Sequence, residues 1–403
     1  MRSLLLRLAG FGSLPLIASL SPLLVLGVVA RACSPDEWAA LGIGQAVGSF
    51  ATVAVTFGWT MVGPPAVATA ASPDDRRDLY VVSWWVRVGA ATLVIPAAVV
   101  LSVVLAPSAP VLAAAMCTST ALTGLSMAWF AVGIGRPRTA AAFDVLPRLA
   151  ALAAGAVAVV VTAEPVWFPV CAGAGTLLAL HAFHRRLIGR LVPPWPGWAS
   201  VLRALRRSAP GAAVMSVGSV YTSAPVPVAS LIGAADQVAR MSSADRVYRY
   251  SLFAVSSLAD ALQSWVLERG VRDRRQSVAI VGHAVLASAG GGALVLLGPL
   301  ATELLFGAAL GSSRAVFAGY GLAFFFVCLS TPFVRNILVP LGHARAVLAA
   351  NVAGLVTGAS VLVPATAAAG VPGVSLAFAA TEGVTMGYVI VRAVVAWRAA
   401  ARG

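Results

Sequence analysis

HRRLIGRLVPPWPGWASVLRALRR, residues 184–207, is the longest polar interruption in this sequence and lies at its middle. It holds six of the 28 arginines and a Pro-Pro-Trp-Pro break, whereas long apolar segments lie on both sides. We interpret residues 188–208 as a cytoplasmic linker that joins two halves, residues 1–187 and residues 209–403. The linker fits either a short amphipathic segment at the lipid headgroups or a plain basic anchor.

The composition identifies an integral membrane protein. Of the 403 residues, 60% are hydrophobic and only 10% are charged, whereas soluble domains carry about 25% charged residues. A spanning helix needs about 20 apolar residues. Dividing the chain at charge clusters and Pro/Gly breaks therefore predicts an all-α polytopic membrane protein with about twelve transmembrane helices, near residues 10–31, 38–63, 80–105, 109–134, 138–163, 166–187, 209–232, 242–268, 277–299, 315–340, 345–367 and 371–396.

The arginines predict the orientation of these helices. Loops on the amino-terminal side hold 20 arginines, the opposite loops hold three, and five arginines lie inside helices. Because basic residues collect in cytoplasmic loops, both termini are expected in the cytoplasm. We therefore expect a multi-pass protein of the cytoplasmic (inner) membrane.

Two short motifs recur at similar spacing in the two halves. Asp36–Ala39 lies 200 residues before Asp236–Ala239, and Gly135–Arg138 lies 207 residues before Gly342–Arg345. Each pair occupies equivalent loops, and a shift of six helices preserves orientation. We predict two six-helix bundles related by a pseudo-twofold axis along the membrane normal, with a cleft between them.

Several function classes are excluded or disfavoured. The sequence contains no lysine, so it has neither a Walker A phosphate loop nor a lysine for Schiff-base chemistry. His181 and His184 have no carboxylate or cysteine beside them that would suggest a metal site. We expect no catalytic residues, cofactor or metal, no nucleic-acid partner, and a protein that is not an enzyme.

Charges inside predicted helices are candidates for function because they are costly in lipid. In 242–268, Asp245 and Arg249 have the spacing of an ion pair. Arg246 then either binds an anionic group, such as a diphosphate or an acidic sugar, or forms a salt bridge to another helix. Glu382 is the deepest lone carboxylate, and it is either a protonation site or neutral and hydrogen-bonded.

Other polar residues have structural explanations as well as functional ones. Asp144 and Arg148 share one helical face and are expected to neutralise each other. Arg87 and Arg335 lie near cytoplasmic helix ends, where they either snorkel, pack or serve function. Gln45, with Ser49 one turn later, lines the cleft or bonds a neighbouring helix.

The sequence resembles the polysaccharide flippase family, the O-antigen and lipid-linked oligosaccharide translocases of the multidrug/oligosaccharidyl-lipid/polysaccharide exporter superfamily. The resemblance is carried by Gly42–Ala46, by Ala128–Phe130 through Gly135 and Arg138, and by Ala244–Arg246. It implies a cationic cavity, alternating access and a polyprenyl-diphosphate-linked glycan as substrate. The family resemblance places substrate-binding residues at Arg246, Arg249, Asp245, Gln45 and Arg31, and Asp36 joins Glu382 as a candidate for ion coupling.

We therefore expect a transporter that flips a polyprenyl-diphosphate-linked oligosaccharide across the cytoplasmic membrane for cell-surface polysaccharide biosynthesis. A drug or cation antiporter of the same superfamily is the first alternative, although it would favour a carboxylate-rich cavity. A membrane-embedded glycosyltransferase or polymerase is the second. The expected partners are the lipid-linked glycan, membrane lipids, and polysaccharide polymerases or glycosyltransferases of the same pathway.

Overall fold

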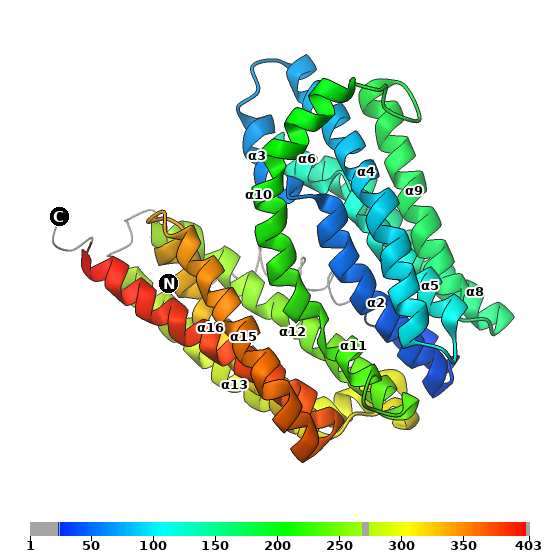
Figure 1. Ribbon diagram of the computed structural model, residues 1–403, viewed down its shortest axis with the longest axis vertical. Coiled ribbons are helices and arrows are strands. Elements are labelled where there is room, and N and C mark those ends of the chain that lie inside the picture. The colour runs from blue at the N-terminus through cyan, green and yellow to red at the C-terminus, as the bar shows by residue number, and fades with distance from the viewer. Residues whose placement is uncertain (1–22, 24, 268–273, 400–403) are drawn as a thin grey trace. The chain divides into compact units, whose positions relative to one another are not determined.

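The computed structural model describes residues 23, 25–267 and 274–399, and within them the chain is helical, without a strand (Figure 1). The first predicted helix lies mostly outside the described residues. Each of the other eleven predicted helices coincides with helical structure, so the expected all-α architecture is confirmed. Contacts divide the chain into an N-terminal unit, Val28–Ser230, and a C-terminal unit, Leu231–Gly403, to which the few described residues before Val28 also belong.

The N-terminal unit contains several helices that are broken into pieces. Its elements are α2 (Pro35–Thr56), α3 (Trp59–Ala68), α4 (Pro73–Leu105), α5 (Pro110–Leu122), the 3-10 turn η1 (Thr123–Leu125), α6 (Ala128–Gly133), α7 (Pro137–Ala140), the π-helix η2 (Ala141–Val145), α8 (Leu146–Thr162), α9 (Trp167–Ile188), α10 (Trp198–Ser223) and α11 (Pro225–Ser230). Helices α10 and α11 contact α2 in this unit, so the division by contacts falls after residue 230. The linker at residues 188–208, which the sequence places between two six-helix halves, stays a prediction.

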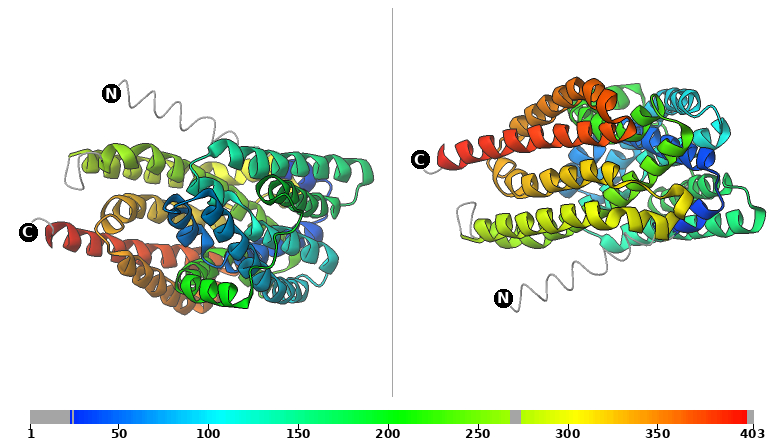
Figure 2. Two further views of the ribbon diagram at one scale, coloured as in Figure 1. Left: turned by 90° about the horizontal axis from the view of Figure 1, so that it is seen from above. Right: turned by 90° about the horizontal axis from the view of Figure 1, so that it is seen from below.

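The C-terminal unit is made of longer helices, and Figure 2 shows α13 and α16 as nearly straight rods. Its elements are α12 (Ala235–Leu267), α13 (Arg274–Phe306), the 3-10 turn η3 (Ala308–Leu310), α14 (Arg314–Phe333), the π-helix η4 (Val334–Leu338), α15 (Ala344–Ala369) and α16 (Val371–Ala399). Helix α14 packs against α13 and α16, and α15 packs against α16.

Eight helical segments among the described residues are long and apolar enough to cross a membrane. Three more long helices, α9, α10 and α12, coincide with predicted spans. Helix α10 begins at Trp198, eleven residues before the predicted start at 209, because the Leu- and Arg-rich end of the linker is itself helical. The sequence-based boundary was placed at the charges, whereas the helix continues through them.

The repeat between the halves extends to the capping of the helices. Helix α2 begins at Pro35, where the Glu37 carboxylate accepts a hydrogen bond from the backbone N–H of Ser34 at 2.8 Å. Helix α12 begins 200 residues later, and there the Gln237 side-chain oxygen accepts a hydrogen bond from the backbone N–H of Ala234 at 3.3 Å. The third helical residue therefore caps the helix start in both units.

The second repeated motif has the same backbone in both units. Gly135 and Gly342 adopt left-handed conformations with φ of 64° and 79°, which glycine adopts without steric cost. Each stands two residues before a new helix, α7 or α15. The equivalence predicted from the sequence at this turn is thus confirmed by the local backbone.

Small residues bring neighbouring helices into close contact. A Cβ built on Gly48 of α2 would lie 2.7 Å from the carbonyl oxygen of Cys117 in α5. In the C-terminal unit, Gly354 and Gly358 of α15 face Thr381 of α16 in the same way. Membrane helices associate through such small-residue contacts because lipid supplies no hydrophobic force between them.

We expect Gly48→Ala to lower the stability of the N-terminal unit, because even a methyl group meets the α5 backbone. Overpacking of this kind costs about 1–3 kcal/mol. Gly89→Ala in α4 is the matched control, since a Cβ there meets nothing within 4 Å. Melting of the purified protein in detergent measures the difference, and equal melting temperatures for the two variants would contradict the proposed contact.

Candidate functional site

The charged segment of α12 is organised around Asp245. Its carboxylate accepts a hydrogen bond from Arg249 Nε at 2.5 Å and another from the Tyr320 hydroxyl of α14 at 3.1 Å. The predicted ion pair one turn apart is therefore present. The Asp245 side chain is 8% exposed, whereas that of Arg249 is 33% exposed. The buried carboxylate thus holds a guanidinium that remains partly accessible.

Aromatic side chains fix this pair from the neighbouring helices. Tyr248 stacks on Tyr320 with ring centroids 4.9 Å apart, and Phe378 of α16 packs edge-on against Tyr248 at 5.7 Å. Tyr248 and Tyr320 are both buried. Side chains from three helices of the C-terminal unit, α12, α14 and α16, therefore pack around Asp245 and Arg249.

Arg246 is 3% exposed, so its side chain is not open to solvent in this conformation. It lies beside Asp245 in the sequence but is not placed by the structure in an accessible cavity. Its role as a substrate ligand therefore stays a prediction. A conformational change would be needed to expose its guanidinium to a substrate.

A second charged contact joins α12 to the end of α14. Arg335, in the π-helix η4, donates a hydrogen bond to Asp260 at 2.6 Å. This contact and the one between Tyr320 and Asp245 each join residues that are 75 positions apart. A constant separation requires α12 and α14 to run in the same direction, as the predicted topology demands. The two contacts lie 15 residues apart on each helix, or about 22 Å.

The candidate residues of the N-terminal unit lie in or next to α2. Arg31 and Asp36 are exposed near its start, and Asp36 is the second residue of the helix. Gln45 and Ser49 are half-buried, and the Ser49 hydroxyl donates to the Gln45 carbonyl at 2.7 Å. Ser49 thus bonds its own helix, and the role of the Gln45 side chain stays a prediction.

Glu382 is buried in α16, where its side chain is 6% exposed. Within the residues that the structure describes, its carboxylate forms no ion pair and no hydrogen bond. An unpaired charge in the hydrocarbon layer is costly, so such a position is a functional candidate by default. The role of Glu382, as a protonation site or as a neutral, hydrogen-bonded carboxylate, stays a prediction.

Arg87 of α4 is packed inside the N-terminal unit instead of snorkelling to the surface, and it is 0% exposed. Its Nη1 donates to the carbonyl oxygens of Ser126 at 2.7 Å and Gly124 at 3.3 Å, at the break between η1 and α6. The guanidinium also lies over the Trp129 ring, with 5.7 Å to its centroid. Arg87 therefore supplies hydrogen bonds that the interrupted helix has lost.

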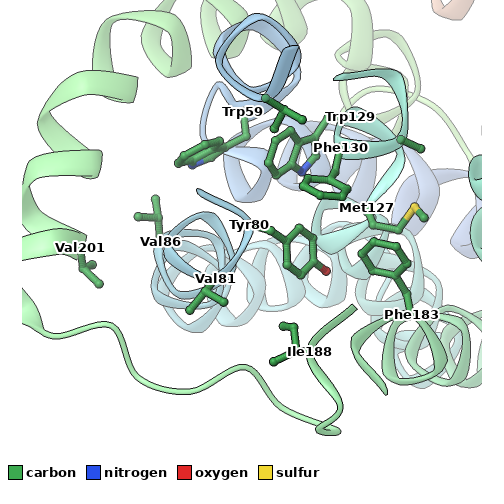
Figure 3. Close-up of a cluster of buried hydrophobic side chains, with 12 residues drawn as sticks. Trp59, Tyr80, Val81, Val86, Met127, Trp129, Phe130, Phe183, Ile188 and Val201 are labelled. Atoms are coloured by element: carbon green, nitrogen blue, oxygen red, sulfur yellow. The ribbon is translucent and has the colours of Figure 1, made fainter. Parts of the chain in front are cut away.

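An aromatic cluster surrounds this break. Tyr80 lies among Trp129, Phe130 and Phe183 (Figure 3), with its ring 5.3 Å from those of Phe130 and Phe183. Its hydroxyl group is 2.9 Å from His184 Nε2. His184 is thus part of the core. The sequence indicated only that His184 has no carboxylate or cysteine beside it, and it did not predict this burial.

The Ser126 side chain connects the break to the charged pair of the fifth predicted helix. Ser126 Oγ donates to Asp144 at 2.6 Å and accepts from the backbone N–H of Ala128, the first residue of α6, at 3.1 Å. Arg148 lies at 3.3 Å from the same carboxylate but is 47% exposed. The predicted pair of Asp144 with Arg148 is therefore confirmed, and Asp144, in the π-helix η2, also accepts a hydrogen bond from Ser126.

The sequence did not reveal Ser126, Tyr320 or the pairing of Asp260 with Arg335. These contacts join residues 18 or 75 positions apart, beyond the reach of helical periodicity. The one available signal was the presence of charged residues in apolar segments. Such residues require a partner inside the protein, but the sequence does not show which residue that partner is.

With this geometry described, the fold can be compared with solved structures. An inward-facing multidrug resistance transporter of the MATE family, in the MOP superfamily, matches with a TM-score of 0.68 and 17% identity, over 94% of this chain and 96% of that one. The lipid II flippase MurJ in an inward closed conformation matches with a TM-score of 0.72 and 13% identity, over 93% and 86%. A MATE protein in a bent conformation gives 0.53 and 14%, over 98% and 96%.

No protein-family model matches the sequence, and no curated protein matches it. The structural likeness establishes the fold. The chain is an all-α polytopic membrane protein with the fold of these MATE and MurJ structures, which has about twelve membrane helices in two bundles. The predicted fold class is therefore confirmed.

We expect Arg87→Met to destabilise the protein, because it removes three hydrogen bonds from a charged donor to the carbonyl groups of Ser83, Gly124 and Ser126. Such bonds contribute about 1.5–3 kcal/mol each. Arg148→Met is the matched control in the same unit, and since Arg148 is half exposed its loss should cost less than about 1 kcal/mol. Thermal unfolding in detergent compares them, and a larger loss for Arg148→Met would overturn the assignment of Arg87.

Proposed function

We propose that the protein flips a polyprenyl-diphosphate-linked oligosaccharide across the cytoplasmic membrane by alternating access, in cell-surface polysaccharide biosynthesis. The fold supports a transporter, because the matching structures are transporters and one of them is a lipid II flippase. The observation that carries the choice of substrate is the charge of α12. This helix holds two arginines and one aspartate within five residues, and Arg249 is partly accessible.

The geometry suggests a division of roles within α12. Arg249 is the proposed contact for the diphosphate, because a guanidinium presents a planar fork of donors that matches phosphate oxygens. Asp245 and Tyr320 are positioning residues that orient Arg249 from the buried side. Arg246 would join the site once a conformational change exposes it. Gln45 and Arg31 are proposed as substrate contacts from the N-terminal unit.

Ion coupling is proposed at Glu382 and Asp36, two carboxylates with different surroundings. Glu382 is buried, so a bound cation or proton would supply the partner that its carboxylate lacks within the described part of the chain. Asp36 is exposed, so water already surrounds its carboxylate. We further propose that both termini lie in the cytoplasm, where the arginine-rich loops belong. Polymerases or glycosyltransferases of the same pathway are the proposed protein partners.

A drug or cation antiporter is the second candidate, and two observations favour it. One matching structure is a multidrug resistance transporter, and Glu382 is a buried carboxylate that would suit a cation. The arginines of α12 argue against it, because they would repel a cationic substrate. A membrane-embedded glycosyltransferase or polymerase is the third, and none of the matched folds is described as an enzyme.

Deletion of the gene, followed by analysis of polyprenyl-linked glycans, tests the proposed function. A flippase predicts that a complete repeat unit accumulates on its carrier at the cytoplasmic face, because synthesis continues and export stops. Loss of repeat synthesis would support the enzyme instead. Normal glycans with increased drug sensitivity would support the antiporter.

Complementation of the deletion tests the role of Arg249. Arg249→Ala should lower glycan export about tenfold or more, since it removes a charged hydrogen bond to the substrate. Arg249→Lys keeps the charge without the fork and should restore export in part. Arg240→Ala is the matched control, because Arg240 is exposed on the same helix. Normal export by Arg249→Ala, at abundance equal to that of the control, would exclude this site.

A further inference from the structure

A groove opens between three helix ends of the N-terminal unit. Its walls are the end of α3, the start of α4 and the start of α10, and its cavity volume is about 480 Å³. That volume falls within the range of small-molecule sites. The polar residues that line it are Thr69, Asp75, Asp78, Ser200, Arg203 and Arg207.

Opposite charges line the two sides of this groove. Asp75 and Asp78 of α4 are three residues apart, and Arg203 and Arg207 of α10 are four apart, so each pair shares one helical face. All four are exposed, and in the part of the chain that the structure describes none of them forms an ion pair. The groove therefore presents separated anionic and cationic sides, which fits a ligand that carries both charges.

The surface beside the groove has the composition of a membrane interface. Trp195, Trp198 and Leu202 are 46%, 72% and 50% exposed, and the rings of Trp195 and Trp198 lie 4.9 Å apart. The linker is held in this position by Trp85 of α4, whose Nε1 donates to the Pro194 carbonyl at 2.9 Å. Exposed tryptophans next to arginines are typical of segments at the level of lipid headgroups.

We propose that this groove binds the headgroup of an aminophospholipid, with the phosphate between Arg203 and Arg207 and the primary ammonium group at Asp75 and Asp78. The acyl chains would lie along the exposed apolar surface of Trp198 and Leu202. The lipid would then bridge α4 and α10, which belong to one unit but contribute opposite charges. This inference is independent of the transported substrate, because it uses no residue of α12.

Lipid binding to the purified, delipidated protein tests the proposal. Phosphatidylethanolamine should raise the melting temperature more than phosphatidylcholine, whose quaternary ammonium group cannot donate hydrogen bonds to the carboxylates. Asp78→Asn should remove that preference and leave binding of both lipids. Asp75 is unsuitable for this test because it also caps α4 through Ser72.

Arginine variants test the phosphate side of the groove. Arg203→Gln with Arg207→Gln should weaken binding of every phospholipid, by about fivefold for each arginine removed. Arg185→Gln with Arg186→Gln is the matched control, since these exposed arginines at the end of α9 do not line the groove. Arg203→Lys with Arg207→Lys keeps the charge and should retain most of the binding.

Three outcomes would overturn the proposal. One is equal binding by the Arg203 and Arg207 glutamine variant and its control. Another is equal stabilisation by the two lipids. The third is full stabilisation by soluble glycerophosphoethanolamine at the same concentration, which would assign the groove to a free zwitterion instead of a lipid.

Discussion

This structure depends on one constraint: charged and polar groups buried away from water must be paired inside the protein. In the hydrocarbon layer, each polar group must find its partner within the protein. Arg87 shows how the constraint is met, since it is 0% exposed and donates to two carbonyl groups freed by the break before α6. The carbonyl groups at the break need the arginine as a hydrogen-bond donor, and the buried arginine needs these carbonyl groups as acceptors. Asp144 completes the arrangement from the other side through Ser126.

The same constraint shapes the C-terminal unit. There the fourth predicted helix of the half ends in the π-helix η4, and Arg335 within it pairs with Asp260. Because Tyr320 bonds Asp245 near the other end, α12 is tied to α14 at two places. Any movement of α12 within its unit would have to break one of these contacts. We infer that α12 and α14 move as one body, which keeps Arg249 in place relative to α14.

Much of the fold could be predicted from the sequence because it is local. Apolar segments of about 20 residues mark the helices. The motif that recurs at Asp36 and Asp236 lies at equivalent helix starts, although the predicted starts at 38 and 242 are later than Pro35 and Ala235. The break at Phe57 and Gly58, which separates α2 from α3, was missed, since both residues are apolar or neutral and no charge marks the site. The start of α10 was also placed too late. Arginines mark the end of the part of a helix that lies in the membrane, but the helix itself can continue through them.

The candidate site was predictable only in part. The spacing of Asp245 and Arg249 was sufficient to predict their ion pair, because it repeats with the helix. The partnership of Asp245 with Tyr320 was not, since it depends on how α12 and α14 pack. The burial of Arg246 was missed for the same reason. Sequence reasoning identifies which residues are costly in lipid, whereas the structure shows what compensates for the cost.

Flipping in vesicles tests the central claim most directly. The purified protein would be placed in liposomes that contain a labelled polyprenyl-diphosphate oligosaccharide, and the glycan exposed to an impermeant enzyme would be followed with time. The account predicts that inner-leaflet glycan becomes accessible faster than in protein-free vesicles. Accessibility no faster than in protein-free vesicles, from folded protein, would contradict it.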